Sequence, residues 1–319
     1  MLGALILPGF GSGQTQADAR LNEQEADSAA ATYNYKFPLL GKKVVERGFD
    51  VPYPFGISAN FLRQKFDVTI TDLRLSLGDA EMVPIDIVEF ENAGTDLNTF
   101  NVRLDLWVLP FLNISGMYGD GRGRTSVVLS EPVSFSTEVE FRGRYYGFGI
   151  MGAYGIERWF TTVDWSQTWF DTDLLHNPVL ATIASIRAGR SFPVGKMNVN
   201  FWVGMMYQDY ANLTEGTVTA DQIFGGALQD ALEGYQDTEW YQDLGRPQQA
   251  VVDEIFGAIQ AVDPSAVRIN YGLDKRPTNP RNLLVGARWE FSKRWELRVE
   301  GGFIGRKQLL ASLAFHWPW

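Results

Sequence analysis

Hydrophobic and polar residues alternate over most of the chain, and its end shows the alternation most clearly. There the hydrophobic positions are every second residue, namely Leu309, Ala311, Leu313, Phe315, Trp317 and Trp319. A period of two is typical of a β-strand with one apolar face. The same period recurs at 98–108, 146–154, 159–169, 179–190, 199–207, 283–291 and 295–299. The pattern therefore predicts an all-β protein.

The connections between these strands fall into two sets that alternate along the chain. The short ones lie near Pro110, Gly155, Phe192 and Ser292. The others are the segments 120–133, 171–177 and 211–281. Short turns at one end and longer loops at the other are typical of a transmembrane antiparallel up-and-down β-barrel of the outer membrane. In this arrangement Trp319 and the short turns lie in the periplasm.

The number of strands depends on the first third of the barrel. Hydrophobic positions change parity twice there, from 57–61 to 66–70 and again to 73–77. If these changes are strand boundaries, the barrel has about 12 strands, an even number as single-chain bacterial barrels require. If 56–77 and 82–108 are each one long, broken strand, the total is about 10, which is also even.

Residues 211–281 interrupt the barrel pattern. Thr219 and Gln222 have the spacing of a helix-capping box, and hydrophobic residues follow at helical intervals. A second helix is expected to begin near Pro247 and to end before Pro264. We therefore predict a helical extracellular insertion within a barrel that covers 55–319.

The first residues carry no sustained strand pattern. The apolar stretch at 2–10 and the A-x-A sequence at 17–19 predict that 1–19 is a truncated signal peptide, although no basic region precedes it. The alternative is a disordered tail. Residues 20–54 are expected to form a periplasmic or lumenal N-terminal segment.

The composition agrees with a barrel. Aromatic residues make up 13% of the 319 residues, as expected for aromatic girdles at the two membrane interfaces. We assign seven to the lipid interface: Trp159, Trp165, Trp289, Trp295, Phe315, Trp317 and Trp319. The mean hydropathy is −0.14, and no run of apolar residues is long enough for a membrane helix. A net charge of −10 argues against a nucleic-acid partner.

Three segments resemble a family of uncharacterised Gram-negative outer-membrane β-barrel proteins. They are RLDLWVLPFLN at 103–113, GARWEFSKRWEL at 286–297 and GRKQLL at 305–310. The resemblance extends over roughly 98–210 and 282–319. It implies a β-barrel in the outer membrane of a Gram-negative bacterium, with outer-membrane lipid, lipopolysaccharide and the barrel assembly machinery as partners. It implies no established activity, so no catalytic residue is carried over.

The face of each strand opposite the lipid points into the lumen. Nine charged residues on that face are the candidates for lining it: Arg103, Asp105, Asp164, Arg187, Arg288, Glu290, Glu296, Arg298 and Glu300. Opposite charges on adjacent strands favour cross-strand pairs. They predict either the charged wall of a narrow, porin-like channel for small solutes or a salt-bridged plug that keeps the barrel closed. A further hypothesis is an interaction barrel whose insertion at 211–281 binds a partner protein.

The least supported hypothesis is an outer-membrane hydrolase. The chain has only two histidines, His176 and His316. Ser312 lies about 13 Å from His316 along a strand, which is too far for a hydrogen bond. His176 is expected in an outer loop near Asp171 and Asp173. We therefore expect no enzyme activity.

No motif predicts a metal site or a cofactor, since the chain has no cysteine and no metal-ligand spacing. The segment 121–124, Gly-Arg-Gly-Arg, is expected in a solvated outer loop where its arginines could contact lipopolysaccharide phosphates. It lacks the strand-to-helix setting of a phosphate-binding loop.

Overall fold

The structure, a computed structural model, describes residues 33–47, 51–84, 90–129, 135–195, 197–210, 213–220, 232, 234–261 and 266–318. The expected signal peptide at 1–19 and the terminal Trp319 lie outside these residues.

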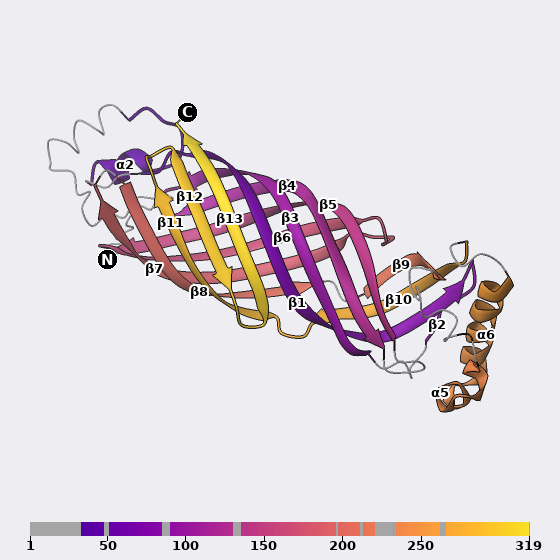
Figure 1. The fold of residues 1–319 in the computed structure, drawn as a ribbon. Helices are drawn as coiled ribbons and strands as arrows, with labels where there is room; N and C mark the ends of the chain where they lie inside the picture. The colour runs from indigo at the N-terminus through magenta and orange to yellow at the C-terminus, as the bar shows by residue number, and fades with distance from the viewer. Residues whose placement is uncertain are drawn as a thin grey trace, which may run out of the picture.

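Ten antiparallel strands close a barrel (Figure 1). They are β1 (Phe55–Leu77), β3 (Phe90–Leu109), β4 (Leu112–Leu129), β5 (Phe135–Ile156), β6 (Trp159–Thr172), β7 (Val179–Val194), β8 (Met197–Tyr210), β11 (Arg281–Glu290), β12 (Trp295–Gly302) and β13 (Arg306–Trp317). β13 pairs with β1 from Phe55↔Trp317 to Phe66↔Arg306 and so closes the ring. The fold class is confirmed, with ten strands in the closed barrel.

The segment 56–77 is one long strand, not two or three. β1 pairs with β13 and β3 along its first half and with β10 (Arg268–Pro277) along its second. A bulge between Thr71 and Arg74 shifts its register, and Asp72 has a φ of 52° there. A bulge adds one residue and moves hydrophobic positions to the other parity without ending the strand. The second parity change is therefore a bulge.

The insertion differs from the prediction because part of it is β-structure. β9 (Leu213–Thr219) pairs with β10. β10 and the short β2 (Val83–Pro84) pair with the second half of β1. The helical part contains η2 (Tyr235–Asp237), α5 (Glu239–Asp243) and α6 (Arg246–Ala261). The expected second helix is α6. Gln222 of the expected capping box lies outside the described residues.

The predicted outer loop at 120–133 is also mostly strand. β4 continues to Leu129 and pairs with β5 from Phe135 onward. Arg122 and Arg124 therefore stand on the outer face of a strand, because the strand pair extends beyond the apolar part of the wall.

The last residues of β13 and the short connections from β3 to β4, from β5 to β6 and from β11 to β12 lie at one end of the barrel, and α5 and α6 lie at the other (Figure 1). Outer-membrane barrels keep short turns in the periplasm, so we call these the periplasmic and extracellular ends. At the periplasmic end, residues 33–47 with α2 (Gly41–Val45) and residues 51–54 pack on the barrel. Leu39 N donates to Val108 O at 2.8 Å, and Trp107 N donates to Pro54 O at 2.8 Å.

The barrel is apolar outside and polar inside around its periplasmic half. Large hydrophobic side chains are exposed on the outer face, among them Phe100, Ile150, Val163, Val203 and Val285. Polar side chains are buried inside, among them Ser191, Asn200, Glu300 and His316. An apolar belt of this extent is stable in lipid and not in water. None of the helices in the described part of the chain is long and apolar enough to cross a membrane.

Candidate functional site

The first parity change on β1 marks the level at which the hydrophobic side chains move from the outside of the barrel to its inside. Ile57 and Phe61 face outward and are exposed, whereas Phe66 and Val68 face inward and are buried. Above Phe61 the outer face carries Arg63 and Lys65, both paired with Asp96 at 3.5 and 2.7 Å. The extracellular part of the barrel therefore has a charged exterior and an apolar interior.

The lumen in the periplasmic half is filled by a network of ion pairs centred on Glu300, which we call the lower network. Arg187 donates to both Glu300 oxygens at 2.6 and 3.0 Å and to Asp164 Oδ2 at 2.5 Å. Arg298 and Trp202 each donate to Glu300 Oε2 at 2.8 Å. The Glu300 side chain is 1% exposed, and such a buried charge needs these partners.

A second group of ion pairs lies in the same half, nearer to the periplasmic turns. Arg288 Nη2 is 2.8 Å from Glu290 Oε1, and its Nε is 3.9 Å from Glu296. Asn200 donates to Glu290 at 2.6 Å, and His316 Nε2 lies 3.9 Å from Glu296. These contacts join the neighbouring strands β8, β11, β12 and β13 along one side of the lumen.

The structure thus brings seven of the nine lumen candidates into ion pairs. Asp105 instead accepts a hydrogen bond from Asn113 Nδ2 at 3.0 Å, and Arg103 lines a small cavity of about 120 Å³ beside Arg187 and Arg298. Trp107 and Trp202 fill further space in this half, since they are 1% and 6% exposed. Trp202 needs the glycine at 286, because a Cβ there would lie 2.3 Å from its ring.

The extracellular half of the barrel encloses a much larger space, which we call the upper chamber. Its volume is about 520 Å³, and hydrophobic side chains of β1, β3, β4, β5, β6, β7 and β10 line it. Phe66, Leu75, Val127, Phe141 and Phe170 are examples. The volume lies within the range of roughly 300–1,000 Å³ found for pockets that bind small molecules. Sequence analysis missed this chamber, although the parity change at 61–66 is its signature.

Two side chains, Met117 and Ser166, line both the small cavity and the upper chamber. Just above the lower network, Asn60 donates to Asn101 Oδ1 at 2.8 Å, and Asn101 donates to Tyr145 Oη. Arg306 donates to Gln208 and lies 5.2 Å from the centre of the Phe66 ring. The lumen therefore passes from apolar surroundings, through a layer of amide and phenol side chains that includes Arg306, to the ion pairs of the periplasmic half.

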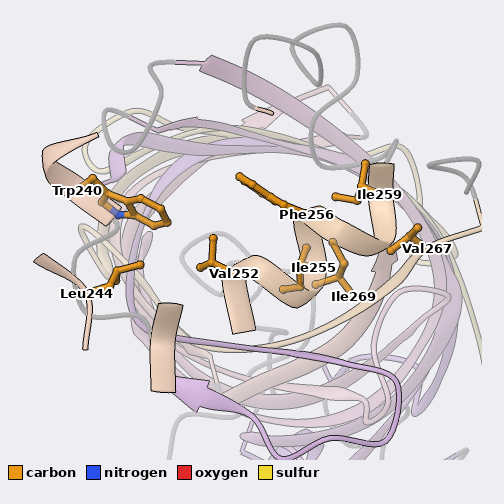
Figure 2. Close-up of a cluster of buried hydrophobic side chains, with 9 residues drawn as sticks. Trp240, Leu244, Val252, Ile255, Phe256, Ile259, Val267 and Ile269 are labelled. Atoms are coloured by element: carbon orange, nitrogen blue, oxygen red, sulfur yellow. The ribbon is translucent and has the colours of Figure 1, made fainter. Parts of the chain in front are cut away.

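Helices α5 and α6 form a roof over the upper chamber. Trp240, Val252, Ile255 and Phe256 line it from above, and these side chains pack with Ile269 in one cluster. In the view of Figure 2, Val252, Ile255 and Phe256 lie within the outline of the ring of strands. α6 is also tied to the barrel rim, where Gln248 Nε2 donates to Pro84 O at 2.7 Å.

The roof is held together by hydrogen bonds to Asp253. Tyr235 and Tyr241 donate their hydroxyls to its two oxygens at 2.9 and 2.8 Å, and Gln236 donates at 3.1 Å. Burial alone would raise the pKa of Asp253, but the hydrogen bonds lower it below its usual value. Desolvation and the neighbouring Asp253 raise the pKa of Tyr241 to about 12. Both groups therefore keep these protonation states over a wide pH range.

The aromatic residues expected at the lipid interface stand on the outer face. Trp159, Trp165 and Trp295 are 56%, 37% and 46% exposed, whereas Trp289, Phe315 and Trp317 are partly exposed. Phe315 packs between Trp295 and Trp317, with ring centres 4.9 and 6.1 Å away. This cluster lies at the periplasmic end.

The histidines occupy separate places. His176 Nε2 is 3.0 Å from Thr217 Oγ1, which donates to Asn270 at 2.7 Å. His316 is in the lower lumen beside Glu296. Within the described residues, no group of three or more His, Asp or Glu side chains could hold a metal ion.

No protein-family model and no curated protein sequence matches the chain. The chain is similar in structure to the translocator domain of the autotransporter NalP from Neisseria meningitidis, at 13% identity, with 92% of this chain and 98% of that chain covered and a TM-score of 0.35. It is also similar to the outer membrane protein OprG from Pseudomonas aeruginosa, at 7% identity, 84% and 98% coverage and a TM-score of 0.39. A third is the Ralstonia pickettii toluene transporter TbuX, at 10% identity, 98% and 100% coverage and a TM-score of 0.29.

The closed strand order and the outward apolar belt define the chain as a porin-like outer-membrane β-barrel. It is a protein of the Gram-negative outer membrane, where its belt is in contact with lipid.

Proposed function

We propose that this barrel carries small hydrophobic solutes across the outer membrane and that the upper chamber is where it binds them. The observation that supports this most directly is the apolar space of about 520 Å³ beneath α6. A water-filled pore would need a polar wall throughout its length, and the extracellular half has an apolar one. Seven of the nine charged residues expected to form a pore wall are instead paired with one another below the chamber.

In this proposal the lower network closes the lumen toward the periplasm, so ions do not pass in the resting state. The remaining space beside Arg103 and Arg187 is about 120 Å³, less than a quarter of the chamber. Passage then requires the ion pairs to rearrange, whereas binding in the chamber does not.

Filling the chamber tests this function. Ala181 lies on β7, lines the chamber and is 7% exposed, whereas Leu180 beside it pairs with Trp169 on the outer face. We expect Ala181→Trp to abolish binding of the neutral fluorophore N-phenylnaphthylamine to the purified barrel in amphipol. Leu180→Trp, the matched control, should bind like the wild type. Equal binding by all three proteins would refute the proposal.

The interaction-barrel hypothesis has less support. The apolar side chains of α6 point into the barrel, and its outer face carries exposed residues such as Arg246, Glu254 and Gln260. A partner at 211–281 would therefore have to recognise a polar surface. We further propose that the protein has no enzyme activity, since His176 is bonded to Thr217 and not to a carboxylate.

Two partners follow from the proposed location. Arg122 and Arg142 stand opposite each other on β4 and β5 above the apolar belt, where they can bind lipopolysaccharide phosphates. We also propose that the barrel assembly machinery inserts the protein, as expected for a barrel closed by a C-terminal aromatic strand.

A further inference from the structure

The upper chamber contains one charged side chain among its described lining residues, Lys275 of β10. Lys275 pairs in register with Ile70 of β1 and stands on the same face of β10 as Tyr271 and Leu273, which also line the chamber. Its neighbours Asp274 and Arg276 belong to the opposite face of the strand. The ammonium group therefore borders an otherwise uncharged space.

Lys275 makes no ion pair with any carboxylate in the described part of the chain. β10 lies above the apolar belt, since it pairs with β1 beyond Phe66. There burial lowers the pKa of Lys275 to about 8, and no partner opposes that effect. The partly buried arginines at 187, 288 and 298 in the lower lumen differ, because each has a carboxylate within 4.0 Å. The buried Arg306 between the two regions donates instead to the amide oxygens of Gln64 and Gln208.

An unpaired ammonium beside an apolar space is unfavourable unless a ligand supplies the missing anion. A molecule with a hydrophobic body and one carboxylate satisfies both parts of the site, because its body fills the chamber and its head pairs with the lysine. We propose that the upper chamber binds amphipathic carboxylates and that Lys275 binds the carboxylate head. This inference rests on the proposed function, since it names the class of solute that the chamber takes.

The experiment compares two probes with the same tail, dodecanoate and the neutral dodecanol, each at a concentration below micelle formation. Binding of both to the amphipol-solubilised barrel is measured by equilibrium dialysis at pH 7. We expect Lys275→Met to lower the affinity for dodecanoate about tenfold to a hundredfold, as for loss of a charge-assisted hydrogen bond. The affinity for dodecanol should stay unchanged.

Two further variants serve as controls. Arg276→Met removes the adjacent exposed cation and should leave both affinities unchanged, whereas Lys275→Arg should keep dodecanoate binding. Heat-modifiable migration in gels verifies that each variant is folded. If Lys275→Met binds dodecanoate as tightly as the wild type, the inference is wrong even though the chamber binds solutes. If the wild type binds neither probe, both the inference and the proposed function fail.

The pH dependence gives a second readout. The chamber residues nearest to Lys275 on β1 and β9 are the uncharged Ile70 and Thr214. On β8 and β10, the titratable residues that line the chamber besides Lys275 are Tyr210 and Tyr271. Dodecanoate binding should therefore weaken as the pH rises through and above about 8, whereas dodecanol binding stays constant. A flat profile for dodecanoate would contradict the role of Lys275.

Discussion

The substitution Glu300→Gln tests whether the lower network holds the lumen closed. The Glu300 carboxylate accepts hydrogen bonds from Arg187, Arg298 and Trp202, and its side chain is 1% exposed. Glutamine keeps the shape of the side chain but removes its charge. Arg187 retains Asp164 at 2.5 Å, whereas Arg298 has no second ion pair in the described part of the chain. The Arg298 guanidinium, whose side chain is 27% exposed, is then left without a counter-charge.

Removing one partner of a buried ion pair costs about 3–5 kcal/mol. We expect the free energy of unfolding of Glu300→Gln, measured by urea titration in lipid vesicles, to fall by about that amount. The matched control is Glu138→Gln, which breaks an ion pair of 2.8 Å with Arg124 on the outer surface. These two side chains are 54% and 46% exposed, so the control should lose less than about 1 kcal/mol.

The same variant should change conductance. In planar bilayers we expect the wild type to remain closed and Glu300→Gln to show discrete openings, because the ion pair between Arg187 of β7 and Glu300 of β12 is lost. Glu138→Gln should remain closed. A Glu300→Gln protein that unfolds within 1 kcal/mol of the wild type and never opens would refute the assignment of the lower network as the closure.

The remaining predictions concern two glycines and the roof. Gly286→Ala should lower the free energy of unfolding by about 1–3 kcal/mol, since the added Cβ would lie 2.3 Å from Trp202. On α6, an added Cβ at Gly257 meets nothing within 4 Å, so Gly257→Ala should raise the free energy of unfolding by up to about 1 kcal/mol in the same urea titration. Asp253→Asn removes the charge that binds Tyr235 and Tyr241, so stopped-flow mixing should show faster entry of N-phenylnaphthylamine, and an unchanged rate would contradict the role of the roof. In the wild type, the contribution of Asp253 to the stability of the roof should be full above its unfolded pKa of about 3.9. It should disappear as the pH falls through the lower pKa that Asp253 has in the folded protein. The contribution of Tyr241 to the stability of the roof should be full below pH about 10 and should disappear as the pH rises through about 12. The entry rate of N-phenylnaphthylamine should therefore be constant between pH about 4 and about 10.

The period-two pattern is sufficient to predict the barrel, its closing strand and the sorting of its turns, because each of these depends only on which residues alternate. The number of strands is harder to predict. A bulge, a strand boundary and a change of surroundings all shift hydrophobic positions from one parity to the other. Only the partner strand distinguishes them: β1 stays paired with β13 and β3 across the first change and with β10 across the second.

The change of surroundings along a strand also limits the prediction of the candidate site. Choosing lumen residues from the polar face is correct for strands in lipid, and it places Arg187 and Glu300 inside the barrel. Above the membrane the polar face is the outer one, so the rule selects the wrong face there and misses Lys275. A signal was present, since Ile269, Tyr271 and Leu273 alternate up to Lys275 within the supposedly helical insertion.

The two halves of the lumen imply that binding and passage are separate steps. A hydrophobic solute gains free energy in the upper chamber, where it leaves water for an apolar wall. It gains none among the ion pairs below, so the lower network opposes its further movement. Glu300→Gln should therefore leave the affinity of the chamber for dodecanol unchanged while it speeds the release of dodecanol from the periplasmic end of the barrel in reconstituted vesicles. If affinity and release changed together, the chamber and the lower network would act as one site, and the separation of the two steps would be wrong.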